Sequence, residues 1–197
     1  MTRAPIAKSV ILRGSAFALA FGTAFLATSP VFAQQAYKEP FDRPLAVVSP
    51  NYVTLVLSVD VKRPAAAVWD QIGKFCSIRD WMQVSCEIAK GDDVTLGAVR
   101  IVRGKVIEMM IARTPTSYTY TQPVRVDWPF NAYHATLEVR PLGKKTSKLF
   151  YSFFYDNSML ASDAARTEEI ANRKQRMGKM LQNMKILAEG GTLPPIP

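Results

Sequence analysis

Residues 52–81 read YVTLVLSVDVKRPAAAVWDQIGKFCSIRDW and change periodicity partway along. Over 52–61, apolar and polar residues alternate, which predicts a half-buried strand. A proline at position 64 then opens a helical run. Gly73 interrupts this run, and a second short helix is expected around Phe75–Trp81. The passage therefore predicts a strand followed at once by two short helices.

Beyond this passage, short strand signals alternate with turns that hold Gly, Pro or Asp, the residues that tight reversals need. Apolar residues then recur at helical spacing from Asp163, and Gly190-Gly191 supplies a stop. The pattern predicts an α+β fold in which a seven-stranded antiparallel sheet wraps around a long C-terminal helix. The six further strands are expected at 84–90, 96–103, 106–113, 117–122, 132–140 and 148–156.

The first 33 residues have the three-part pattern of a signal peptide. Three basic residues precede an uncharged run at 14–28, and a small-x-small cleavage site follows at 31–33. An uncleaved membrane anchor is the alternative. We expect Sec-type export to the periplasm and no transmembrane segment after cleavage. The predicted parts are a signal peptide at 1–33, an extended arm at 34–51, one domain at 52–190 and a tail at 191–197.

The charge of the expected mature chain is moderately basic. Removing the three leader cations from 25 lysines and arginines leaves 22 against 16 acidic residues, a net charge of +6. The basic residues are scattered, which is typical of solvated faces, and export also argues against nucleic acid as a partner. A basic face could still meet anionic lipid or a periplasmic protein partner. The scattered residues include Arg100, Arg103, Lys105, Arg173, Lys174, Arg176 and Lys179.

Cys76 and Cys86 are the two cysteines of the chain. In an oxidising compartment they can form a disulfide, and two separately buried thiols are the alternative. The single histidine, His134, alternates with residues on the solvent side of its strand, which excludes a Ser-His-Asp arrangement in a cavity. With one histidine and no CxxC pair, we expect neither a metal site nor a cofactor.

The order of elements resembles the helix-grip fold shared by START lipid-transfer domains, the birch-pollen-allergen group and polyketide cyclases. The resemblance covers roughly residues 52–189 and points to the SRPBCC/START-like superfamily, of the polyketide cyclase/dehydrase and lipid transport type. The branch it resembles includes plant abscisic-acid receptors and MxaD-like bacterial proteins. The similar stretches are PAAAVWDQIGKFCSIRDW at 64–81, VSCEIAKGDDVTLGAVRIVRGKVIEMM at 84–110, SYTYTQP at 117–123 and FNAYHATLEVRP at 130–141.

The chain departs from the plant receptors at two places. Asp80 stands where they have the lysine that anchors the hormone carboxylate. Their Gly-Leu-Pro gate loop has no counterpart, because residues 103–105 make only a tight turn. Both departures speak against abscisic acid itself as a ligand.

A cavity between sheet and helix is implied by the resemblance, and strand alternation indicates its walls. An inward apolar face would carry several tyrosines, whose rings and hydroxyls suit an apolar pocket with a few oriented polar groups. Plain core packing against the helix is the alternative. The predicted ligand-binding residues are Asp80, Trp81, Glu108, Met110, Tyr118, Tyr120, Phe130, Tyr133, Ala135, Tyr151, Phe153, Met177, Met180 and Met184.

Glu108 interrupts an otherwise apolar strand and should face the same side as Val106 and Met110. A buried carboxylate is costly unless it is paired or protonated, so Glu108 is a candidate for holding a polar group of the ligand or a water. A structural ion pair with Arg100 or Arg103 on the neighbouring strand is the alternative.

These observations favour a periplasmic binding or carrier protein for a small hydrophobic molecule or lipid. A cyclase- or dehydratase-type enzyme is the second hypothesis, with Glu108, Asp80 and a cavity tyrosine as its acid–base groups. The third is an accessory protein that docks on a periplasmic dehydrogenase, as the MxaD resemblance suggests. The sequence assigns no catalytic residue.

Overall fold

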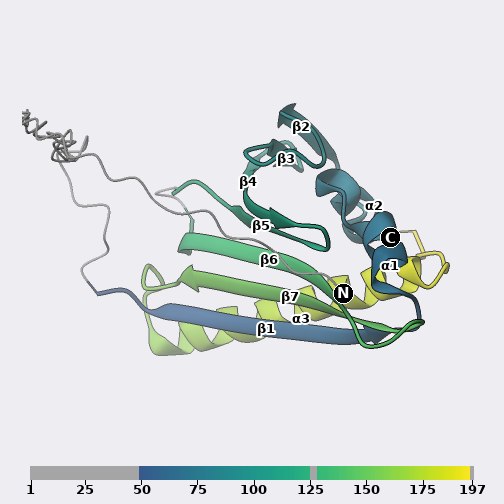
Figure 1. Cartoon of the computed structure of the whole chain (residues 1–197). Helices are drawn as coiled ribbons and strands as arrows, with labels where there is room; N and C mark the ends of the chain where they lie inside the picture. Colours follow the sequence, from purple (N-terminus) through teal and green to yellow (C-terminus); the bar gives the residue numbers. More distant parts are fainter. Residues whose placement is uncertain (1–48, 125–127, 196–197) are drawn as a thin grey trace, which may run out of the picture. The chain divides into compact units, whose positions relative to one another are not determined.

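The computed structural model describes residues 49–124 and 128–195 (Figure 1). The predicted signal peptide at 1–33 and most of the predicted arm at 34–51 lie outside these residues. The elements are β1 (Tyr52–Val61), α1 (Ala65–Ile72), the short 3-10 helix η1 (Phe75–Ser77), α2 (Ile78–Met82), β2 (Cys86–Lys90), β3 (Val99–Val102), β4 (Val106–Thr114), β5 (Ser117–Thr121), β6 (Asn131–Pro141), β7 (Ser147–Asp156) and α3 (Asp163–Ala188).

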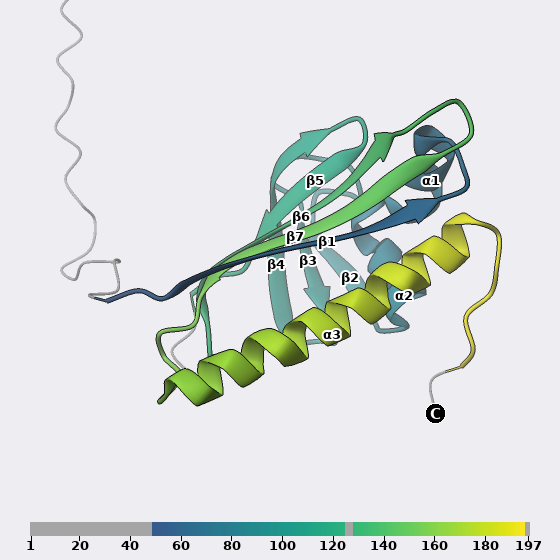
Figure 2. The same cartoon turned by 90° about the horizontal axis from the view of Figure 1, so that it is seen from below.

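The seven strands form one antiparallel sheet in the order β1-β7-β6-β5-β4-β3-β2. Strands β2 to β7 follow one another as neighbours, while β1 pairs with β7 at the far edge. The helices α1 and α2 therefore carry the chain from one edge of the sheet to the other. In Figure 2, α3 runs beside β1 and β7, and both strands contact it. The predicted helix-grip α+β fold is confirmed.

Local sequence explains where the helices begin and end. Gly73 is the residue at which α1 ends. The position requires glycine, because a Cβ there would lie 2.4 Å from the ring of Trp69. The hydroxyl of Ser162 caps α3 by accepting a hydrogen bond from the backbone N–H of Ala165 at 3.2 Å. At its other end, Gly190 adopts a φ of +87°, which stops the helix.

The core lies between the inner face of the sheet and the helices. Alternate residues of β6 and β7 are buried, as the period-2 pattern predicts. From α3, Met177, Leu181 and Met184 fill the space opposite them. No helix within the described residues is both long and apolar enough to cross a bilayer.

The strand β3 begins three residues later than predicted, at Val99 rather than Leu96. The cause is two turns before it. The Asp92 carboxylate accepts hydrogen bonds from the backbone N–H groups of Val94 and Thr95 at 2.8 and 2.7 Å. A second turn follows over Leu96 and Gly97, where a strand was expected, and the backbone N–H of Ala98 closes it by donating to the Thr95 carbonyl oxygen at 3.0 Å.

The two cysteines form a disulfide between η1 and the first residue of β2. Of the two alternatives that the sequence left open, the bridge is therefore the one observed. The backbone N–H of Cys76 also donates to the Asp93 carboxylate at 2.6 Å. Together these contacts fix η1 against the β2–β3 edge of the sheet.

Candidate functional site

A cavity of about 240 Å³ lies between the inner face of the sheet, α2 and α3; we call it the inner cavity. It is smaller than the roughly 300–1,000 Å³ usual for small-molecule sites. Its walls combine apolar, aromatic and cationic side chains. They are Ile78, Met82, Val102, Arg103, Val106, Glu108, Tyr120, Gln122, Trp128, Phe130, Tyr133, Tyr151, Arg173, Arg176 and Met177.

The predicted site residues divide into those that line the inner cavity and those that do not. The lining ones are Glu108, Tyr120, Phe130, Tyr133, Tyr151 and Met177. Others on the same faces are buried in the core beside it: Trp81, Met110, Tyr118, Ala135, Phe153 and Met184. Met180 lines a neighbouring outer pocket of about 250 Å³.

Asp80 is the predicted residue that the structure places elsewhere, because its side chain is exposed on α2. The five residues of α2 bury Ile78 and Trp81, so the positions between them face solvent. Asp80 is therefore not among the residues that line the inner cavity.

Glu108 forms a buried ion pair with Arg100, as one of the two sequence alternatives proposed. The register of the β3–β4 hairpin places the two residues opposite each other. The Arg100 Nε and Nη2 atoms both lie 2.6 Å from the Glu108 Oε2 atom. Gln122 donates to the other carboxylate oxygen at 2.8 Å. Both oxygens of Glu108 are thus occupied by protein groups.

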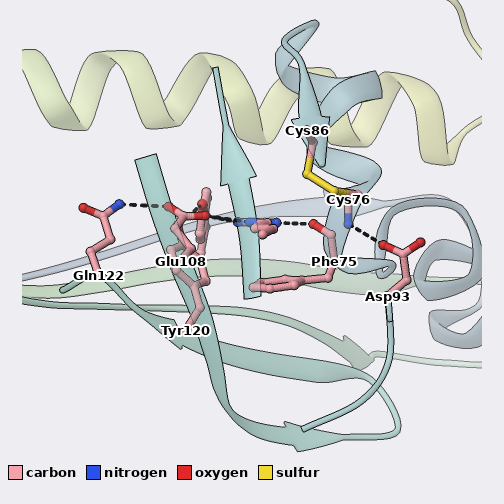
Figure 3. A network of polar contacts seen from close by, with 9 residues as sticks. Phe75, Cys76, Cys86, Asp93, Glu108, Tyr120 and Gln122 are labelled. Atoms are coloured by element: carbon pink, nitrogen blue, oxygen red, sulfur yellow. Dashed lines mark hydrogen bonds and ion pairs between the residues drawn. A yellow bond between two sulfur atoms is a disulfide. The ribbon is translucent and has the colours of Figure 1, made fainter. Parts of the chain in front are cut away.

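Arg100 continues this line of contacts away from the cavity. Its Nη1 atom donates to the carbonyl oxygen of Phe75, and its guanidinium lies 4.2 Å from the Phe75 ring centroid. Figure 3 follows the contacts from Gln122 through Glu108 to Phe75 and on to the disulfide. Burial lowers the pKa of Arg100, but the Glu108 carboxylate and the neighbouring tyrosines together outweigh it and hold that pKa above its ordinary value. Arg100 therefore stays charged.

Three phenols gather beside this pair. The Tyr120 and Tyr151 hydroxyls share a hydrogen bond of 2.8 Å. Burial raises the pKa of Tyr133 to about 12, although the Arg173 charge opposes the rise. Burial also raises the pKa values of Tyr120 and Tyr151 well above the ordinary phenol value. At neutral pH these hydroxyls are protonated, so they can donate hydrogen bonds to a ligand but are poor bases.

Arg173 is buried, although the sequence pattern indicated a solvated face; Arg100 is a second exception of the same kind. The guanidinium of Arg173 lies 4.2 Å from the Tyr155 ring centroid and 4.5 Å from that of Phe130. Its Nε atom donates to Glu169, one turn earlier, at 2.6 Å. Flat aromatic surfaces accept a guanidinium plane well, which explains how the charge is accommodated.

Two features of the sequence could have revealed the missed lining residues. Arg173 falls on the apolar stripe of α3 between Ile170 and Met177, with Glu169 four residues before it, which is the spacing of a helical ion pair. Gln122 continues the inward alternation of Tyr118 and Tyr120. Arg103 and Arg176 carry no such signal, because they come from a turn and from the exposed edge of the helix.

The arrangement suits binding better than proton transfer. Its carboxylate is held by Arg100 and Gln122, and its phenols stay protonated. The residues lining the inner cavity include no lysine or histidine among those described. The described residues also contain no group of three His, Cys, Asp or Glu side chains that could hold a metal ion.

Solved structures with the same fold include proteins of different kinds. A protein of Thermobifida fusca is 23% identical, with a TM-score of 0.57 over 72% of this chain and 97% of that one. Norcoclaurine synthase from Thalictrum flavum, solved with dopamine and hydroxybenzaldehyde, is 16% identical, with a TM-score of 0.57 over 75% and 92%. Ara h 8.0201 is 14% identical, with a TM-score of 0.54 over 70% and 98%. At such identities the likeness establishes the fold alone.

No protein of curated function matches the sequence. A family profile does match, over residues 52–189, which is most of the chain and includes every helix and strand of its described residues. The description of the family names polyketide cyclases, dehydrases and lipid transport. The chain belongs to the polyketide cyclase / dehydrase and lipid transport family.

Proposed function

We propose that this protein binds and carries a small hydrophobic molecule or lipid in the inner cavity. The observation that carries the proposal is the composition of the cavity wall. Apolar and aromatic side chains form most of it, and protonated tyrosine hydroxyls offer a few directed hydrogen bonds. Pockets of this composition are typical of sites for small apolar ligands.

We also propose that the carrier acts in the periplasm. The leader pattern of residues 1–33 supports export. The disulfide supports it as well, because such bonds persist in oxidising compartments. Expression in a Gram-negative host should release a chain that begins at Gln34 into the osmotic-shock fraction, as read by intact mass. Full-length chain in the inner membrane would contradict this proposal.

A cyclase- or dehydratase-type enzyme is the second candidate, favoured by the hydroxyl cluster of Tyr120, Tyr133 and Tyr151. Such a reaction needs a base, and Glu108 is the one carboxylate among the described lining residues. Arg100 and Gln122 already occupy both of its oxygens, so neither is free to take a proton from a substrate. This is why we rank carriage above catalysis.

The carrier proposal is tested with the neutral fluorescent probe 1-aminoanthracene and a variant that fills the cavity. Val106 lines the cavity and is partly exposed, so Val106→Trp can enter it without disturbing the deep core. We expect the parent to bind the probe and V106W not to bind it. Val56→Trp is the matched control, because Val56 is 62% exposed on β1.

Extraction of protein purified from its native periplasm, followed by mass spectrometry, should identify the carried molecule. Equal probe binding by V106W and V56W would show that the probe sits elsewhere. A parent protein that binds no probe and yields no extracted ligand would overturn carriage and favour an accessory protein docking on a periplasmic dehydrogenase.

A further inference from the structure

The inner cavity adjoins the outer pocket, which lies between α2, the β3–β4 turn, α3 and the segment after α3. The two spaces share Met82, Arg103 and Arg176 as lining residues, so they meet at these side chains. The outer pocket holds about 250 Å³. A ligand larger than the inner cavity can therefore extend outward past these shared side chains.

The outer pocket is positively charged. Arg103, Arg176 and Lys179 line it, and no Asp or Glu is among its described lining residues. Within the described part of the chain, the guanidinium groups of Arg103 and Arg176 form no hydrogen bond or ion pair. This contrasts with Arg100 and Arg173, whose charges are matched by Glu108 and Glu169.

The positive charge also reaches the inner cavity. Burial raises the pKa of Tyr133, while Arg173 and, to a smaller extent, Arg176 act to lower it. Towards the start of α3, Glu168 and Glu169 line the surface together with Arg173 and Arg176, so positive and negative charges are mixed there. The Arg103–Arg176 side has no acidic residue among its described lining residues, so an anion is favoured there.

The segment after α3 completes the outer pocket. Leu193, Pro194 and Pro195 contribute its apolar wall. The side chain of Gln83 donates a hydrogen bond to the Pro194 carbonyl oxygen at 2.9 Å, which ties this segment to the end of α2. The pocket therefore has an apolar wall and a cationic wall. Such a pocket suits the part of a ligand where an apolar chain meets a negatively charged group.

We propose that the two spaces together hold an amphiphile with one oxyanion head, a carboxylate or a phosphate. Its apolar body lies in the inner cavity, and its head lies at the mouth beside Arg103 and Arg176. The inference rests on the proposed function and narrows it, because a neutral hydrophobic molecule would leave both guanidinium groups without a counter-ion from the ligand.

The test compares four compounds that each carry a ten-carbon chain, all below their micelle concentrations: decanoate, decyl phosphate, decanol and decyltrimethylammonium. Each displaces 1-aminoanthracene from the mature chain, which gives its dissociation constant. We expect the better anion to bind about tenfold tighter than decanol, as one charged hydrogen bond provides. The cation should bind most weakly. Tighter binding of decanoate assigns a carboxylate head, and tighter binding of decyl phosphate assigns a phosphate head.

A double variant, Arg103→Gln with Arg176→Gln, should reduce the affinity for the better anion to that for decanol and leave decanol unchanged. Arg79→Gln with Lys174→Gln is the matched control, because both residues are exposed and line neither space. If decanol binds as tightly as the anions, or if the control variant loses as much affinity for the better anion, the oxyanion site is overturned. The carrier function proposed above would still stand. If neither the probe nor any of the four compounds binds, the proposed function fails as well.

Discussion

Arg100 and Arg173 are both buried against aromatic rings beside the inner cavity, but their charges are enclosed in different ways. Arg100 and Glu108 lie on neighbouring strands, and their side chains are 0% and 5% exposed. Arg173 and Glu169 lie one turn apart on α3, and Glu169 is 15% exposed. Arg100 also donates to a main-chain carbonyl, whereas Arg173 faces the cavity.

The difference separates a structural charge from one open to a ligand. A buried charge that loses its partner is strongly destabilising, because no water replaces the lost interaction. Arg100 is in that position, since strands and η1 enclose it. Arg173 keeps access to the space that a ligand or water would fill. The same residue type therefore supports the sheet at one site and shapes the binding surface at the other.

The largest effect is expected from Glu108→Leu, which leaves the Arg100 charge enclosed without a counter-ion. We expect the free energy of unfolding, measured with urea, to fall by about 3–5 kcal/mol. Adding Arg100→Met to this variant should restore most of the loss, because the remaining charge is then removed. If the free energy of unfolding fell by less than about 1 kcal/mol, Arg100 would have found water or another partner. Its site would then not be closed to solvent.

Removing the disulfide is expected to cost somewhat less. The double variant Cys76→Ala, Cys86→Ala opens a loop of ten residues next to Phe75, whose carbonyl oxygen accepts from Arg100. Chain entropy predicts a loss of about 2–3 kcal/mol in the free energy of unfolding. Reduced parent protein should match the double variant in the same denaturation experiment. Identical stability of oxidised and reduced parent would show that the bridge does not support the Arg100 site.

Glu169→Leu makes the same substitution at the open site. Arg173 would keep its ring contacts and its access to the cavity, so we expect a loss of only about 1–2 kcal/mol in the free energy of unfolding. Comparison with Glu108→Leu under identical urea conditions tests the contrast directly. Equal losses for the two variants would remove the distinction between a sealed and an open arginine.

The smallest effect at neutral pH is expected from Tyr133→Phe, at less than about 1 kcal/mol. Its signature lies at high pH. The native phenol holds its proton to a pKa of about 12, whereas the unfolded one releases it near 10. The native state then binds more protons, so the stability of the parent should fall as pH rises from about 10 towards 12. The fall should be shallower in the variant, and parallel curves would contradict the raised pKa.

The sequence predicted the fold well because the fold depends on local repeats. Alternation in β1 and the apolar stripe of α3 both follow from the geometry of a single element. The start of β3 was misplaced because a backbone hydrogen bond from Ala98 to Thr95 closes a turn over Leu96 and Gly97, an effect that a hydrophobic pattern does not record.

The candidate site was harder to predict, because strand alternation gives a face but not the depth along it. Tyr118 and Tyr120 share the inner face, yet Tyr120 lines the cavity while Tyr118 is covered by Trp69 and Phe75, with ring centroids 5.7 and 5.4 Å away. What covers each tyrosine depends on where α1 and η1 pack. Arg173 was missed for a related reason. A charged residue in a helix is expected to face solvent, and the sequence does not show that the rings of Phe130 and Tyr155 pack against this one.

The bridge between Cys76 and Cys86 has a consequence for how the chain acquires its native covalent form. The chain has two cysteines, so this is the one intramolecular pairing available to it. One round of oxidation is therefore sufficient: one cysteine forms a mixed disulfide with the oxidant, the other displaces the reduced oxidant, and no scrambled isomer within one molecule can form. Production of correctly linked protein needs an oxidase but no disulfide isomerase, and the sole mispaired product to guard against is an intermolecular dimer.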